Sequence, residues 1–118
     1  MTIALIATKD KHTLLLNFAK AYHSALSKYK IVSTDYTASL IEKNCPIQVE
    51  KLTALQSDSI QLISPKIANN EINMLIFFKG VSSDEKVDNG ILTLCDRYNI
   101  PYATNSATAE ILIKSVIY

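Results

Sequence analysis

Met74-Leu75-Ile76-Phe77-Phe78 is a run of five large apolar residues, and it decides the fold class of this chain. A strand that is apolar throughout, instead of alternating apolar with polar residues, is covered on both faces. Sheets of parallel strands with helices on both sides bury their strands in this way. The sequence therefore predicts that residues 74–78 form a central strand of such a sheet.

Other short apolar runs alternate along the chain with longer segments of helical period. The remaining predicted strands are residues 3–7, 30–33, 48–50 and 101–104, and the predicted helices are residues 12–29, 37–42, 58–70, 87–98 and 107–115. Asp10 is predicted to cap the first helix, and Pro65 to kink the third or to divide it into two short helices. This alternation is typical of an α/β fold, with a five-stranded parallel sheet in a three-layer α/β/α domain that spans residues 1–118.

The composition excludes several functional classes. The 118 residues suffice for one domain, and 48% hydrophobic with 19% charged residues is typical of a compact chain. A net charge of +1 gives no overall positive field that would attract long nucleic acid. No run approaches the ~20 apolar residues that span a membrane. Cys45 and Cys95 lie too far apart for a CxxC motif. We expect a cytoplasmic protein with reduced thiols.

The ligand crevice of an open α/β sheet lies outside the carboxyl ends of its strands. In this chain four loops follow predicted strands: residues 8–11, 34–37, 79–84 and 105–106. We expect these loops to surround one site.

The opening run Ile3–Ala7 and the closing run Asn99–Glu110 (NIPYATNSATAE) resemble methylglyoxal synthase. The resemblance implies a five-stranded parallel α/β/α domain that assembles as a homohexamer. It also implies conversion of dihydroxyacetone phosphate to methylglyoxal and phosphate, by proton abstraction and elimination, without a metal or an organic cofactor. Related domains bind nucleotides or phosphorylated metabolites and regulate carbamoyl phosphate synthetase.

The loop after the first strand departs from the family pattern. Where the family has His and Asp, this chain has Thr8 and Lys9, and His12 stands at the position of a phosphate-binding Lys. Lys9, Lys11 and His12 place positive charge at a helix N-terminus, where free backbone donors favour an anion. We predict ligand contacts at these four residues, Thr8 included. The alternative is a solvated loop with ordinary surface lysines.

The loop after the second strand reads Thr34-Asp35-Tyr36-Thr37, where the family has Thr-Gly-Thr-Thr that binds phosphate. Thr34 and Thr37 match this pattern, and the alternative role for both is helix capping. Asp35 brings a negative charge to the position of the glycine. Tyr36 is predicted to stack on a ring of the ligand, unless it packs on the core.

The loops that carry the family's catalytic carboxylate and histidine are also altered. A glycine-rich loop with the catalytic Asp is replaced by residues 55–60, in which Ile60 takes the place of the base. Only a two-residue slip would put Asp58 there, and the N-cap of the following helix is the preferred role for Asp58. After the central strand, Asp84 falls at the family's His and Val87 at its Asp. Ser57 and Asn105 complete the predicted ligand contacts.

Three functional hypotheses follow from this pattern. The first is a methylglyoxal synthase-like protein that binds a phosphorylated small molecule or nucleotide without synthase activity. The second is an active synthase with Asp58 or Asp84 as the base, although losing one acid-base group costs about 10²–10⁴-fold in rate. The third is an interaction protein whose homo-oligomer matters more than its pocket.

Overall fold

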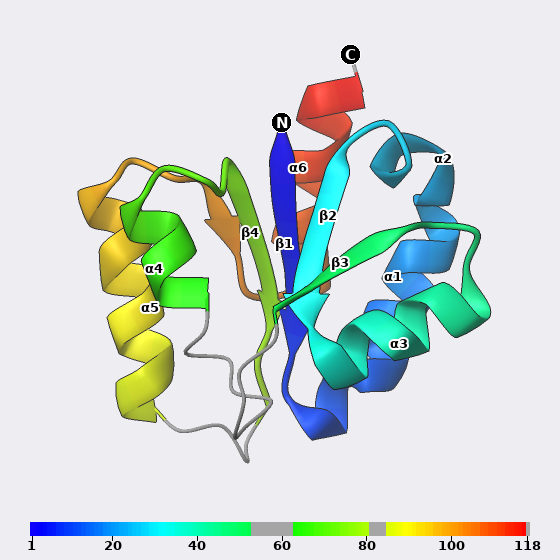
Figure 1. The fold of residues 1–118 in the computed structure, drawn as a ribbon, viewed down its shortest axis with the longest axis horizontal. Coiled ribbons are helices and arrows are strands. Elements are labelled where there is room, and N and C mark those ends of the chain that lie inside the picture. Colours follow the sequence, from blue (N-terminus) through cyan, green and yellow to red (C-terminus); the bar gives the residue numbers. More distant parts are fainter. Residues whose placement is uncertain (53–62, 81–84, 118) are drawn as a thin grey trace.

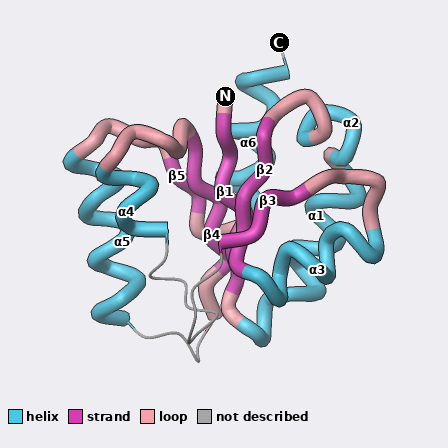
Figure 2. Tube along the Cα trace, viewed as in Figure 1, coloured by secondary structure: helices cyan, strands magenta, loops and turns pink. Residues whose placement is uncertain are grey.

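The computed structural model describes residues 1–52, 63–80 and 85–117. Five strands pair in parallel, in the order β3-β2-β1-β4-β5. The strands are β1 (Thr2–Ala7), β2 (Lys30–Thr34), β3 (Val49–Leu52), β4 (Met74–Phe78) and β5 (Tyr102–Ala103). The predicted fold class is confirmed, because the sheet is parallel throughout and helices cover both of its faces (Figures 1 and 2).

The helices divide between the two faces. Their bounds are α1 (His12–Ala21), α2 (His23–Leu26), α3 (Asp35–Asn44), α4 (Ile63–Ala68), α5 (Glu85–Arg97) and α6 (Ser106–Ile117), and a 3-10 turn, Lys9–Lys11, precedes α1. Buried residues of α1, α3 and α6 join one core cluster, and those of α4 and α5 join the other. None of the helices described is long and apolar enough to cross a membrane.

The run Met74–Phe78 is β4, and all five of its side chains are buried, as predicted. Leu75 and Phe77 belong to the cluster beneath α4 and α5, and the other three side chains belong to the opposite cluster. β4 pairs with β5 on one side and with β1 on the other, where Ile3 to Ala7 match Met74 to Phe78 in register. β1 itself lies in the middle of the sheet.

Residues 12–29 were predicted to form one continuous helix, and this prediction is wrong. Tyr22 leaves helical geometry, with φ −116° and ψ 22°, so that α1 and α2 are separate and α2 ends at Leu26. The Nδ1 atom of His23 lies 3.0 Å from the carbonyl oxygen of Lys20. In a continuous helix that carbonyl would accept from the backbone of Ser24. The side chain of His23 thus takes a backbone partner at the break.

One further prediction is corrected. Asp10 does not cap α1, whose N-cap is Lys11 without a side-chain hydrogen bond, and the Asp10 carboxylate accepts from Thr8 instead. Pro65 belongs to α4, and residues 58–62 of the predicted helix lie outside the described residues, so the expected kink or division into two helices remains a prediction.

Ser33 on β2 generates a stability prediction. Its side chain is fully buried, and Oγ has no hydrogen-bond partner among the residues that the structure describes. Burial of such a hydroxyl removes its hydrogen bonds to water, and no hydrogen bond within the protein takes their place. We expect Ser33→Ala to raise the free energy of unfolding by about 1 kcal/mol in urea denaturation.

The neighbouring Thr34 provides the matched comparison, because its buried hydroxyl donates to Thr37. We expect Thr34→Val to lower the free energy of unfolding by about 1 kcal/mol. A destabilised Ser33→Ala protein would show that the Ser33 hydroxyl has a favourable partner after all.

Candidate functional site

Thr8 joins the carboxyl ends of two neighbouring strands. Its backbone N–H donates to the carbonyl of Phe78, the last residue of β4, at 3.1 Å. Its side chain Oγ1 accepts from the N–H of Gly80 at 2.8 Å and donates to Asp10 Oδ1 at 2.8 Å. The hydroxyl of Thr8 is therefore used to hold the loop after β1 against the loop after β4.

Asp10 and Gly80 are in close contact at this junction. A Cβ added to Gly80 would overlap the carboxylate of Asp10. Gly80 has no positive φ, so the backbone conformation does not require glycine here. What requires it is the space that the Asp10 side chain takes.

A second hydrogen-bonded group joins the beginnings of α1 and α3. Thr34 Oγ1 donates to Thr37 Oγ1 at 3.2 Å, and Thr37 Oγ1 lies 3.1 Å from His12 Nε2. Both threonines are buried, whereas His12 is half-buried. We call these three residues the Thr-Thr-His group. It lies where α1 and α3 begin, at the carboxyl-end edge of the sheet (Figure 1).

Proton counting shows how the Thr-Thr-His group responds to an anion. A hydroxyl has one donor and two acceptor lone pairs. Since Thr37 accepts from Thr34, its own proton is directed to Nε2 when His12 is neutral and carries its proton on Nδ1. When His12 is protonated, Nε2 donates to Thr37 instead, and the Thr37 proton is released for another acceptor. Protonation of His12 thus supplies both a positive charge and a hydroxyl donor.

Tyr36 lies beside this group and is 56% exposed, so it does not pack in the core. Its ring centre is 5.3 Å from that of His12, with the planes tilted by 43°. Stacking of this ring on a ligand remains a prediction from the sequence. Lys9 is exposed and Lys11 is half-buried on the turn that leads into α1.

The remaining predicted residues are not joined to this network by the hydrogen bonds described. Asn105 Oδ1 accepts from the N–H of Thr108 at 2.9 Å, which satisfies a free donor in the first turn of α6. Its role in ligand binding remains a prediction. Ser57, Asp58 and Asp84 lie outside the described residues.

Sequence reasoning did not identify Asp88 in α5. This residue is only 2% exposed, and its Oδ2 has no hydrogen-bond partner within the described part of the chain. The sequence held a signal: Asp88 stands three residues before Ile91 and seven before Cys95. These positions share one face of a helix, so that the apolar stripe of α5 begins with a carboxylate.

The described residues contain no group of three or more His, Cys, Asp or Glu side chains able to hold a metal ion. Both cysteines are buried and free. Burial, with a smaller contribution from the charge of Asp96, raises the pKa of the Cys95 thiol to about 11. Because the thiolate is the reactive form, Cys95 is not a nucleophile near neutral pH.

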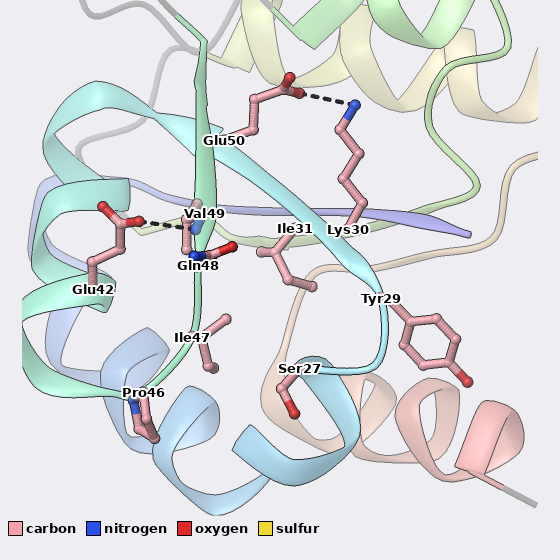
Figure 3. A pocket seen from close by; sticks show the side chains of 10 residues that line it. All are labelled: Ser27, Tyr29, Lys30, Ile31, Glu42, Pro46, Ile47, Gln48, Val49 and Glu50. Carbon is pink, nitrogen blue, oxygen red and sulfur yellow. Dashed lines mark hydrogen bonds and ion pairs between the residues drawn. The ribbon is translucent and has the colours of Figure 1, made fainter.

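A cleft of about 630 Å³ lies away from these residues, beside the amino ends of β2 and β3 (Figure 3). Two pairs of the residues that line it are bonded to each other. Glu42 Oε2 accepts from the N–H of Val49 at 3.1 Å, and Lys30 Nζ lies 3.5 Å from Glu50 Oε2. We therefore place the candidate site at the carboxyl-end edge, where the polar groups of three loops meet.

Comparisons with known proteins agree with this architecture. A model of the MGS-like domain family matches residues 14–104. A methylglyoxal synthase from Caldicellulosiruptor saccharolyticus is 40% identical over 119 residues, covering 98% of this chain and 84% of the relative. Another from Natranaerobius thermophilus is 35% identical and covers 99% of this chain and all of the relative. The crystal structure of methylglyoxal synthase from Elizabethkingia anophelis NUHP1 superposes with a TM-score of 0.84 at 29% identity, covering 95% of this chain and 76% of that one.

The contact between Gly80 and Asp10 can be tested with the two glycines of the chain. We expect Gly80→Ala to lower the free energy of unfolding by about 1–3 kcal/mol, because the methyl group must displace the Asp10 carboxylate. Gly90 lies in α5 with open space around it, so Gly90→Ala should stabilise the protein by up to about 1 kcal/mol.

A double-mutant cycle identifies the cause. In an Asp10→Ala background the carboxylate is absent, and the cost of Gly80→Ala should fall by at least half. An unchanged cost, measured by urea denaturation, would mean that a group other than Asp10 restricts this position.

Proposed function

Because this chain belongs to the MGS-like domain family, we propose that it binds a phosphorylated small molecule or nucleotide at the carboxyl-end edge of its sheet, without the synthase reaction of its relatives. The observation that carries this proposal is the Thr-Thr-His group. It combines two hydroxyls with an imidazole where two helices begin, and free N–H groups at helix N-termini favour anions.

Neighbouring residues support this ligand class. Lys9 and Lys11 add positive charge beside His12, and the exposed ring of Tyr36 offers a stacking surface. Asp35, in the first turn of α3, adds a negative charge on the same loop. A ligand with a ring in addition to its phosphate, such as a nucleotide, would use Tyr36 as well as the Thr-Thr-His group.

The absence of turnover is inferred from Thr8. The resemblance places the family's histidine at this position, and in this chain the Thr8 hydroxyl is committed to Asp10 and Gly80. A threonine hydroxyl does not exchange a proton near neutral pH as an imidazole does. Thr8 therefore holds two loops together and does not supply the acid or base that a histidine would supply at this position.

Methylglyoxal synthesis is the second candidate function. It is favoured by relatives that bear this name and cover nearly the whole chain at 35% to 40% identity. The sequence offers Asp58 and Asp84 as candidates for the carboxylate base, and both lie outside the described residues.

One experiment separates the two functions. The purified protein is titrated with inorganic phosphate, dihydroxyacetone phosphate and nucleoside monophosphates, and methylglyoxal is assayed in the same samples. We expect a rise in melting temperature with at least one phosphorylated compound, because a ligand of the native state stabilises it by mass action. We expect no methylglyoxal above the level without protein.

Methylglyoxal release that Asp58→Ala or Asp84→Ala abolishes would establish the second candidate instead. If no phosphorylated compound shifts the melting temperature, the oligomeric interaction protein becomes the favoured function.

Binding of an anion should strengthen as the pH falls from about 8 to about 5, an interval in which imidazoles ordinarily gain a proton. The reason is that protonated His12 adds a charge and frees the Thr37 hydroxyl. Sulfate is the suitable probe, since its own charge is constant across this range. We expect its affinity to rise about tenfold in the wild type, as measured by calorimetry.

His12→Gln is the control variant, because its amide is long enough to take the place of Nε2 beside Thr37 and does not titrate. Other titratable groups nearby, among them Asp10, Asp35 and the two lysines, are the same in both proteins. Equal pH dependence in the two proteins would show that His12 is not the responsible group.

Assembly and location also remain proposals. The resemblance implies a homohexamer, and free buried thiols suit a cytoplasmic protein. Size-exclusion chromatography with light scattering would give the oligomer number directly.

A further inference from the structure

The cleft of about 630 Å³ beside the amino ends of β2 and β3 is not used by the proposed function (Figure 3). Its volume lies within the range of small-molecule sites, which is about 300–1,000 Å³. Ile31, Ile47 and Val49 line it, and each of them is at most 6% exposed and belongs to the core cluster on the side of α1, α3 and α6. The apolar wall of this cleft is therefore held in place by the packing of the core.

The hydroxyl groups that line the cleft donate their protons to atoms outside it. Ser27 Oγ donates to the carbonyl of Ser24 at 3.0 Å, and the hydroxyl of Tyr29 donates to the carbonyl of Val116 at 2.9 Å. Neither Ser24 nor Val116 lines the cleft. Because a hydroxyl has a single proton, these two side chains can offer a ligand only their lone pairs.

The carboxylate of Glu42 presents further acceptors to the cleft. Its Oε2 atom accepts from the N–H of Val49 at 3.1 Å, which holds the end of this side chain against β3 (Figure 3). A carboxylate has about four acceptor positions, and this bond uses one of them. Glu42 thus has a defined place and acceptor positions left for a donor.

The charged groups that line the cleft are two carboxylates, Glu42 and Glu50, and one ammonium group, Lys30. Lys30 Nζ lies 3.5 Å from Glu50 Oε2, and these side chains are 59% and 44% exposed. The charge of Lys30 is offset by Glu50, so the formal charge that remains is that of Glu42. Gln48 carries both a donor and an acceptor and favours neither sign. The cleft therefore suits a ligand that brings donors and positive charge.

We propose that this cleft is a second binding site, which takes a small organic cation with a primary ammonium group on an apolar body. The ammonium group donates to Glu42, and the apolar body covers Ile31, Ile47 and Val49. The cleft lies at the amino ends of β2 and β3, whereas the candidate site lies at the carboxyl-end edge. The two sites share no residue, so this inference is independent of the proposed function.

Three probes with similar apolar bodies and different charges test this inference by calorimetry at pH 7. Phenethylamine is a cation, phenethyl alcohol is neutral and 3-phenylpropionate is an anion. We expect phenethylamine to bind the wild type with a Kd of about 1 mM or below, as for a well-seated ligand of about ten non-hydrogen atoms. The alcohol should bind about tenfold more weakly, because a hydrogen bond between two charged groups is stronger than one with a neutral donor. The anion should not bind.

Two substitutions should change the affinity for phenethylamine in opposite directions. Glu42→Gln keeps an acceptor for the N–H of Val49 and removes the charge, so the affinity should fall about tenfold, to that of the alcohol. Lys30→Met removes a positive charge and releases the carboxylate of Glu50, so the affinity should rise about threefold, as expected for one exposed charge.

Glu71→Gln is the matched control. Glu71 is an exposed carboxylate whose Oε1 lies 3.8 Å from Lys66 Nζ, and neither residue lines the cleft. This variant should bind all three probes as the wild type does. Urea denaturation of each variant checks that it is folded before its affinity is compared.

The opposite results would overturn the inference. They are no binding of phenethylamine at about 10 mM, equal binding of the amine and the alcohol by the wild type, or an affinity that Glu42→Gln and Lys30→Met both leave unchanged. The last result would show that the amine binds elsewhere on the protein.

Discussion

The parallel pairing of β1 with β2 on one side and β4 on the other is the constraint on which the rest of the structure depends. Since all three strands run in the same direction, their carboxyl ends meet at one edge of the sheet. Helices cover both faces, so the sheet interior is almost wholly apolar. Polar chemistry is therefore confined to the ends of the strands, and Thr8, Thr34 and His12 gather at this edge from separate parts of the chain.

The strands could be predicted from the sequence because a strand that is buried on both faces consists of consecutive apolar residues. Met74–Phe78 and Ile3–Ala7 are apolar throughout, and the pairing of these two strands follows from that property. The helix around Tyr22 was predicted less well. Its apolar spacing continues to Leu26, whereas the break depends on a bond between His23 and the carbonyl of Lys20. Periodicity reports which face is buried, and it contains no information on such local competition.

The residues of the candidate site were also predicted only in part. Thr34 and Thr37 were predicted as ligand contacts from the resemblance to the family's Thr-Gly-Thr-Thr turn, and in the structure their two hydroxyls are hydrogen-bonded to each other. The role of Thr8 was not predictable, because it depends on Gly80, which is 72 residues away in the chain. Asp10 was assigned to a helix cap by its neighbours in sequence, and it is used across the sheet edge instead. Contacts between loops depend on the finished fold, which a local pattern does not contain.

Ser33 and Asp88 show that the same lack of a hydrogen-bond partner has different consequences for a hydroxyl and a carboxyl group. Both have a buried oxygen without a partner in the described residues. A serine hydroxyl is neutral and small, so a fold can tolerate its lost hydration at a cost of about 1–3 kcal/mol. An ionised carboxylate loses far more when it leaves water. The hydrophobic burial of the sheet therefore offsets the cost at Ser33 more easily than the cost at Asp88.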